Sequence, residues 1–201
     1  MKSRVNTLNR LVAARRERVP RGQKLTEKFP VLDLGVRPAF HEKRWRFTVD
    51  GEVEEPLQVD LQGFVDLAPK WQQTSDFHCV TKWSRLDLVW SGISFPQIIA
   101  IVRPTDAAGF VVAYGADGYS INLGLEDVIA DDVLLAFELG GKPLPLEHGG
   151  PMRLLVPKRC AWKSAKFLRR IEFLAEDTPD YWEQRGYHNR GDPDWQEERY
   201  G

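Results

Sequence analysis

The stretch SDFHCVTKW, residues 75–83, sets a histidine beside a cysteine among apolar and β-branched neighbours. The chain has only two cysteines, Cys79 in this stretch and Cys160. Taken by itself, such a cysteine is a buried inert hydrophobe, half of a disulfide, a nucleophile or a metal ligand. The choice among these four depends on which residues elsewhere in the chain could act together with Cys79.

The residues around Cys79 favour neither a Cys–His enzyme nor a zinc site. Adjacent side chains on a strand point to opposite faces, so His78 is poorly placed to be the base for Cys79. The two cysteines and four histidines are scattered, without C-x-x-C or H-x-x-x-H spacing. The local pattern alone therefore favours an inert buried thiol.

Length and composition predict one globular domain with a substantial core. The 201 residues are 42% hydrophobic and 11% aromatic, and the net charge of -1 gives no general reason to expect a nucleic-acid partner. We find no secretory signal and no apolar run of the ~18 residues that a membrane span needs. We therefore expect a cytoplasmic protein without a membrane span, whose cysteines stay reduced.

Charge is concentrated at the two ends of the chain. Residues 1–28 carry nine Lys or Arg, and residues 172–201 carry nine Asp or Glu. Such runs are mostly solvated surface, although a basic arm could also bind an acidic partner such as a nucleic acid. We expect residues 1–43 to form a basic arm packed on or beside the domain. Residues 44–201 would then be the domain, ending in an acidic, aromatic tail.

Periodicity and turn signals predict the α+β class, with irregular mixed β-sheets and short helices. An amphipathic helix is expected over Thr7 to Arg18, a short helix after Asp60, and another from Ser94 to Ile101. Alternation of apolar and polar residues, or short apolar runs between turn signals, predicts the strands. These are the segments RWRFTV, TSDFHCVTKW, FVVAYG, YSINL, DVLLAFEL, MRLLVP and FLRRIEFLA.

Three further segments carry groups suited to an anionic ligand. EHGGPMRLLVP, residues 147–157, places His148 and Arg153 on either side of a tight Gly-Gly-Pro turn. AWKSAKF, residues 161–167, offers lysines and a hydroxyl that suit a phosphate. ADGYSINL, residues 116–123, brings Tyr119 after a flexible Asp-Gly pair. Each segment alone is equally compatible with an ordinary loop, a solvated strand edge or a core residue.

Together these segments resemble the sulfite-oxidase-like, molybdopterin-dependent oxidoreductase family. The similarity runs from about Trp45 to Trp195, and its marks occur in family order. They are DFHCVTKWS, W-S-G at 90–92, ADGYS, HGGPMRLLVP, WKSAKFL and GYHNRGDPDW. The resemblance implies the sulfite oxidase fold and a molybdopterin-binding oxidoreductase domain with a molybdenum–molybdopterin cofactor.

The resemblance also implies roles for individual residues. Cys79 would be the thiolate ligand of molybdenum and a catalytic residue, with His78 and Val80 lining the cofactor beside it. His148 and Arg153 would bracket the pterin. Its phosphate and edge would be bound by the segment Ser164, Ala165 and Lys166. Tyr119 would face the substrate pocket as a second catalytic residue, and Cys160 would be structural.

The expected activity is a two-electron oxygen-atom transfer on a small or protein-bound substrate. Sulfite is not indicated, because the arginines that follow the ligand cysteine in animal and plant sulfite oxidases are missing from residues 80–84. An external electron-transfer protein or a soluble redox carrier would exchange the electrons, since we find no haem, flavin or iron–sulfur motif. The alternative is a non-catalytic module that keeps the fold and binds a ligand or a protein.

Overall fold

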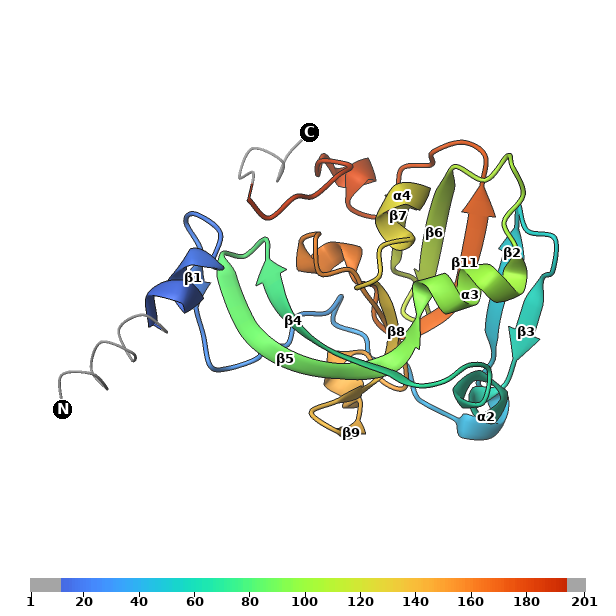
Figure 1. The fold of residues 1–201 in the computed structure, drawn as a ribbon, viewed down its shortest axis with the longest axis horizontal. Coiled ribbons are helices and arrows are strands. Elements are labelled where there is room, and N and C mark those ends of the chain that lie inside the picture. The colour runs from blue at the N-terminus through green and yellow to red at the C-terminus, as the bar shows by residue number, and fades with distance from the viewer. Residues whose placement is uncertain (1–11, 195–201) are drawn as a thin grey trace.

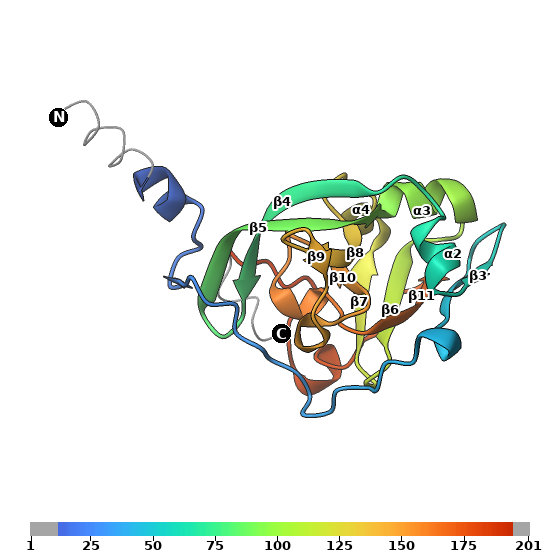
Figure 2. The same cartoon turned by 90° about the horizontal axis from the view of Figure 1, so that it is seen from below.

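The structure is a computed structural model, and it describes residues 12–194 of the chain. Two β-sheets form the body, and short helices lie at their edges (Figures 1 and 2). The predicted α+β class with mixed sheets and short helices is therefore confirmed. No helix within this part of the chain is long and apolar enough to cross a lipid bilayer.

The six-stranded sheet carries the stretch that contains Cys79. Its central path is β1–β5–β8–β10, with β4 paired to β5 and β9 paired to β8. The β1–β5 pair is parallel, whereas the other pairs are antiparallel. The bounds are β1 Lys24–Leu25, β4 Trp71–Cys79, β5 Trp83–Ser94, β8 Leu134–Leu139, β9 Lys142–Pro143 and β10 Arg153–Leu155. The long β4–β5 hairpin curves away from the body toward the N-terminal residues (Figure 1).

The five-stranded sheet has the order β3–β2–β11–β6–β7. Its strands are β2 Phe47–Gly51, β3 Leu57–Val59, β6 Phe110–Gly115, β7 Ser120–Gly124 and β11 Leu168–Leu174. The β2–β11 pair is parallel, whereas β6 runs antiparallel to both β11 and β7. Because β2 and β11 lie far apart in sequence, their pairing brings the beginning and the end of the domain together.

The helices are short, and side chains near their first turns determine where they begin. They are α2 Leu61–Val65, α3 Phe95–Val102 and α4 Leu125–Val128, with 3-10 turns η1 Glu42–Arg44, η2 Leu146–His148, η3 Ala161–Lys163 and η4 Glu183–Arg185. The Gly63 amide donates to Asp60 Oδ1 at 2.8 Å, and Ser94 forms a capping box with Gln97. The helices predicted after Asp60 and from Ser94 are confirmed. Of the predicted first helix, only residues 12–18 lie in the described part, and 12–17 of these are helical.

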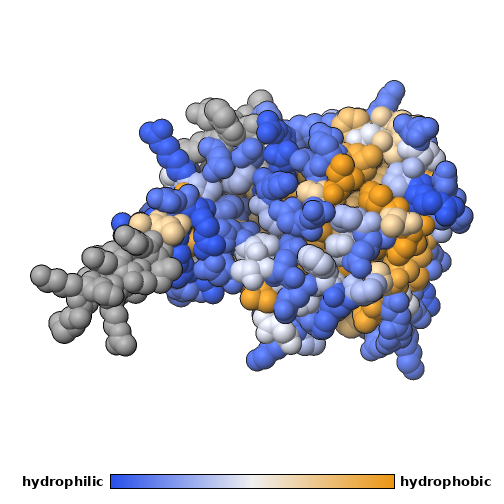
Figure 3. All heavy atoms as spheres, viewed as in Figure 1, coloured by the Kyte–Doolittle hydropathy of each residue, from blue (hydrophilic) through white to orange (hydrophobic). Residues whose placement is uncertain are grey.

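The hydrophobic core lies between the sheets and the short helices. The alternation predicted at the start of the domain is confirmed, because Trp45, Phe47 and Val49 are fully buried. On the surface, hydrophobic residues gather on the side of α3, β2 and β3, whereas the side of β1, β4 and β5 is mostly hydrophilic (Figure 3).

One predicted strand is wrong in extent. TSDFHCVTKW is not a single strand, because β4 ends at Cys79 and β5 begins at Trp83. The Lys82 amide donates to the Cys79 carbonyl at 2.9 Å, and Lys82 has a positive φ of 67°. A lysine in the left-handed region is not a strong turn signal. Because Val80 and Thr81 are β-branched and favour strands, the sequence did not indicate the chain reversal at residues 80–82. This turn places Cys79 at the end of a strand.

The N-terminal residues are attached to the hairpin. Lys24 and Leu25 pair in parallel with Trp83 and Ser84 of β5. Arg18 also donates to Asp87 of β5 at 2.7 Å. From there residues 26–41 run along the body beneath the sheets toward η1 (Figure 2).

Candidate cofactor-binding site

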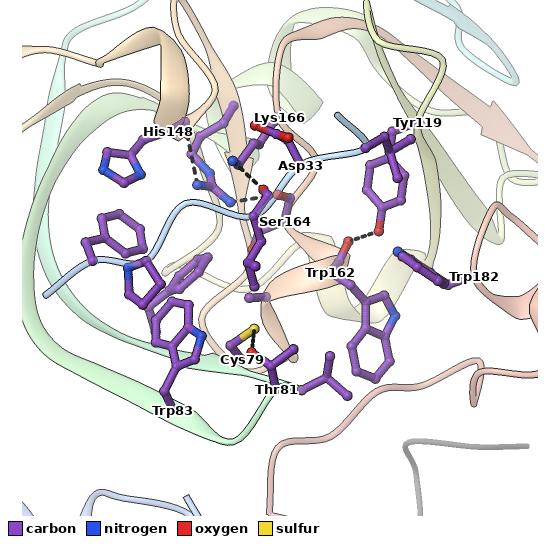
Figure 4. A pocket seen from close by; sticks show the side chains of 18 of the residues that line it. Asp33, Cys79, Thr81, Trp83, Tyr119, His148, Trp162, Ser164, Lys166 and Trp182 are labelled. Atoms are coloured by element: carbon purple, nitrogen blue, oxygen red, sulfur yellow. Dashed lines mark hydrogen bonds between the residues drawn. The ribbon is translucent and has the colours of Figure 1, made fainter. Parts of the chain in front are cut away.

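A cavity of about 290 Å³ gathers most of the reactive groups that the sequence singled out. Its walls come from residues 29–34, the turn after β4, residues 117–119, the loops between 148 and 166, and residues 182–187. Figure 4 shows Cys79 and Thr81 at one edge, with His148 and Lys166 at the opposite edge and Trp162 on a third side. Chain segments far apart in sequence thus converge on one pocket.

Cys79 lines this cavity from the last position of β4. Its side chain is 4% exposed, and its Sγ lies 3.2 Å from the Thr81 hydroxyl. Cys160 is also buried, and within residues 12–194 neither cysteine forms a disulfide. The following turn brings Val80 into the lining as well.

His78 points to the other face of β4. Its Nδ1 lies 2.9 Å from the Ser84 hydroxyl, which in turn donates to Gln23 Oε1 at 2.6 Å. The side chain is not among those that line the cavity, so the expectation that His78 lines the cofactor beside Cys79 is not met. Strand alternation thus separates His78 from Cys79, as the sequence predicts. His78 instead joins β4 and β5 to the N-terminal residues.

The Gly-Gly-Pro turn positions His148 at the cavity. Gly149 has φ 105°, and a side chain there would meet Lys166 Cβ at 3.0 Å, so glycine is required for this close approach. The peptide bond before Pro151 is cis. Burial, followed by the charge of Arg153, lowers the pKa of His148 and favours its neutral imidazole.

Arg153 is a buried cation that ties the turn to the next loop. It is 2% exposed and donates to the carbonyls of His148 at 3.0 Å and Ser164 at 2.8 Å. Its guanidinium also lies 5.0 Å from the Phe77 ring centroid. Burial lowers the pKa of Arg153 to about 10, so it remains charged at neutral pH. Carbonyl dipoles and an aromatic face stabilise that charge, and no carboxylate of residues 12–194 forms an ion pair with it.

The segment after η3 divides its side chains between the cavity and the core. Lys166 Nζ donates to the carbonyls of Leu32 at 2.6 Å and Glu147 at 2.7 Å. Burial and the charge of Arg153 lower the pKa of Lys166 to about 8. Ser164 also lines the cavity, and its hydroxyl accepts a hydrogen bond from the Val156 amide. Ala165 is fully buried and lies outside the lining.

Tyr119 lines the cavity from the residue before β7. Its hydroxyl donates to the Trp162 carbonyl at 2.6 Å (Figure 4). Burial raises the pKa of Tyr119 well above its ordinary value, so the phenol stays protonated. The hydroxyl hydrogen is directed at Trp162 and the Trp182 side chain also hydrogen-bonds to the hydroxyl, so the hydroxyl could only accept, not donate, a further hydrogen bond from a ligand in the cavity.

Several wall residues were not predicted from sequence. Phe29 and residues 30–34 belong to the expected basic arm, and nothing in their composition pointed to a binding site. Trp83 and Trp162 adjoin the quoted motifs, whereas Trp182 and Tyr187 belong to the aromatic, acidic tail. The unusual aromatic content of that tail was the one available signal.

Comparisons with known proteins agree with this geometry. The family model described as the oxidoreductase molybdopterin binding domain matches residues 34–182. Over 184 residues the chain is 41% identical to "Uncharacterized oxidoreductase YuiH" of Bacillus subtilis, covering 91% of this chain and 92% of that protein. It is 30% identical over 153 residues to the protein-methionine-sulfoxide reductase catalytic subunit MsrP of Ralstonia nicotianae, covering 69% of this chain and 46% of that protein.

A solved structure confirms the fold. The sulfane dehydrogenase SoxCD from Paracoccus pantotrophus superimposes with a TM-score of 0.64 at 23% identity, covering 70% of this chain and 40% of that chain. The chain thus spans less than half the length of the MsrP and SoxCD chains that it matches. On the family match and the YuiH similarity, the chain belongs to the oxidoreductase molybdopterin-binding domain family, with the sulfite-oxidase-like fold.

Proposed function

We propose that the chain is a mononuclear molybdenum oxidoreductase in which the Cys79 thiolate ligates the metal of a molybdenum–molybdopterin cofactor. The observation that carries this proposal is the position of Cys79 at one edge of the cavity, with His148 and Lys166 at the opposite edge (Figure 4). A metal-binding thiol and donors for an anionic group thus face the same space.

The donor set fits such a cofactor. A thiolate is a soft ligand suited to a sulfur-rich metal centre, and coordination keeps it deprotonated. Lys166 and the buried Arg153 provide positive charge for a pterin that carries a phosphate.

Two carboxylates also line the cavity, but both are already engaged by the protein. Asp33 accepts hydrogen bonds from Arg37 Nε at 2.8 Å and the Gly35 amide at 3.0 Å. The Arg37 hydrogen bond is the main cause that lowers the pKa of Asp33. Asp117 accepts from the Tyr119 amide at 3.2 Å, and burial raises its pKa. These groups therefore do not cancel the preference for an anionic ligand.

When bound, the cofactor would supply two-electron redox chemistry, which we propose to be oxygen-atom transfer on a small or protein-bound substrate. The residues of the chain would bind the cofactor, orient it and line the pocket around it. Arg153 holds the Gly-Gly-Pro turn against residue 164, so the donors on both segments keep a constant spacing. Tyr119 offers an oxygen lone pair from a protonated phenol, and aromatic side chains form much of the wall.

Electrons would be exchanged with a separate redox protein or a soluble carrier. The relative MsrP is named as a catalytic subunit, which supports a division of labour between catalysis and electron delivery. We therefore propose that this chain carries the molybdenum site and that its redox partner docks from outside.

Metal analysis of protein made in a host that synthesises the cofactor tests the proposal. We expect about one molybdenum per wild-type chain and loss of molybdenum in Cys79→Ala. Cys160→Ala is the matched control, because it removes another buried thiol that does not line the cavity. It should retain the metal. Molybdenum that persists in Cys79→Ala, or wild-type protein without molybdenum, would contradict the proposal.

A further inference from the structure

Lys163 is a fully buried cation that the proposed chemistry does not use. Its side chain is 0% exposed and does not line the cavity. Nζ donates to Glu183 Oε1 at 2.6 Å and to the Asn122 carbonyl and Oδ1 at 3.0 and 2.7 Å. Burial lowers the pKa of Lys163, while the Glu183 carboxylate opposes that shift. Without Glu183, the nearest carboxylate to Lys163 Nζ would be that of Asp180 at 3.8 Å, so the buried charge would be less well compensated.

The partners of Lys163 fasten a C-terminal segment, residues 177–191, to the body. Asn122 on β7 donates through its backbone amide to Asp180 and through its side chain to Asp177 and Asn189, the last two at 2.7 Å. Asp180 also lies 3.8 Å from Lys163 Nζ. Asn122 and Lys163 together therefore contact this segment at several points along its length.

Each member of the ion pair follows a tryptophan of the cavity wall in the chain. Trp162 precedes Lys163 in the chain, Trp182 precedes Glu183, and both tryptophans line the cavity. Figure 4 shows these two side chains on the same side, next to the edge that holds Cys79. Tyr187 joins them, with its ring centroid 5.4 Å from that of Trp162 and 4.8 Å from that of Trp182. Displacing Glu183 would therefore displace the wall.

We propose that Lys163 is a positioning residue whose buried ion pair with Glu183 latches residues 177–191 in place as an aromatic wall that controls access to Cys79. The family model matches residues 34–182, and Glu183 and Tyr187 follow directly after the matched residues. The segment narrows the pocket through the side chains of Trp182 and Tyr187 and needs no bound cofactor to do so. The inference therefore goes beyond the proposed molybdenum chemistry and can be tested without it.

The test measures alkylation of Cys79 by iodoacetamide in cofactor-free protein, made in a host that lacks the cofactor. Peptide mass spectrometry reports Cys79 and Cys160 separately. Glu183→Gln keeps the shape of the side chain but removes its charge, and Tyr187→Ala truncates the wall without touching the buried ions. Glu176→Gln is the matched control, because Glu176 is exposed just before the segment. Hydrogen exchange is followed in parallel for residues 177–191 and for the strands β2, β11 and β6.

We expect Glu183→Gln and Tyr187→Ala to speed Cys79 alkylation roughly tenfold or more, because local opening of the segment becomes easier. Exchange should rise in residues 177–191 and stay unchanged in β2, β11 and β6, while Glu176→Gln should behave as the wild type. Unchanged alkylation in both variants would overturn the proposal. So would an equal rise of exchange in the three strands, because the pair would then be a general stabiliser. Neither result depends on whether Cys79 binds molybdenum.

Discussion

Phe29 stacks face to face on the ring of His148, with the centroids 4.2 Å apart and the planes 11° apart. Phe29 also packs edge-on against Phe77 at 5.4 Å. A residue of the expected N-terminal arm thus holds the imidazole that we propose to lie beside the pterin. The arm is therefore part of the cavity wall, and the site extends beyond the expected domain of residues 44–201.

Phe29→Ala should weaken both the fold and cofactor retention. Loss of the partly buried ring should lower the free energy of unfolding by about 2–3 kcal/mol. Released from the stack, His148 should no longer be held at the cavity, so molybdenum per chain should fall after gel filtration. Phe40→Ala is the control, because Phe40 is 39% exposed and lies outside the cavity lining. Equal molybdenum retention in both variants would show that the stack does not support the site.

Gly149→Ala and Gly118→Ala separate backbone strain from the close approach to Lys166. Both glycines have positive φ, 105° and 81°, so each substitution should cost ~1 kcal/mol of strain. Only the new methyl group at 149 would meet Lys166, whereas nothing lies within 4 Å at 118. Urea titration should show an additional loss of about 1–2 kcal/mol for Gly149→Ala, together with reduced molybdenum content. Identical losses in the two variants would rule out a role for this contact.

Arg153→Lys tests the planar guanidinium. A lysine cannot donate to the His148 and Ser164 carbonyls in the same fork, and it fits the Phe77 face less well. We expect the cofactor-free protein to lose roughly 2–4 kcal/mol of unfolding free energy, because buried carbonyls are left without donors. The same change at the exposed Arg44 should alter stability by less than ~0.5 kcal/mol. A wild-type urea midpoint for Arg153→Lys would contradict this account.

Lys166 should make the stability of the cofactor-free protein depend on pH above neutrality. Its pKa is about 8 in the folded state, below its usual 10.5, because burial and the charge of Arg153 disfavour the ammonium. Arg37 lowers the pKa further, whereas Asp33 and Asp117 raise it. Between pH 8 and 10.5 the unfolded chain binds more protons at this group than the folded chain does. The contribution of Lys166 to stability therefore rises with pH across that window.

Lys166→Met should abolish this contribution. Urea titrations at pH 7, 8, 9 and 10 should show the wild type gaining stability relative to Lys166→Met above pH 8, with no relative change between pH 7 and the onset near 8. A constant difference between the two proteins across the series would mean that the pKa of Lys166 is the same in both states. An anion that binds Lys166 should raise its pKa, so such an anion should bind more weakly as the pH rises through about 8.

Local residue patterns accounted for much of the fold. The alternation at Trp45, Phe47 and Val49, the cap at Asp60 and the capping box at Ser94 depend on neighbours within a few residues, so each was predictable from sequence. The end of β4 was not, because the reversal after Cys79 uses a lysine in the left-handed region. That conformation is maintained by the pairing of β4 with β5, which no local pattern reveals.

For the site, the sequence by itself determined the chemistry of the donors and, through strand alternation, the separation of His78 from Cys79. It also determined the family, because the ordered motifs are preserved along the chain. Only the tertiary structure decided which donors meet. It brought Phe29 to His148 and Lys166 to the carbonyl of Leu32, and it directed Lys163 away from the cavity to Glu183. The physical reason is that these contacts join segments separated by up to 134 residues, and their geometry depends on how the sheets and loops pack.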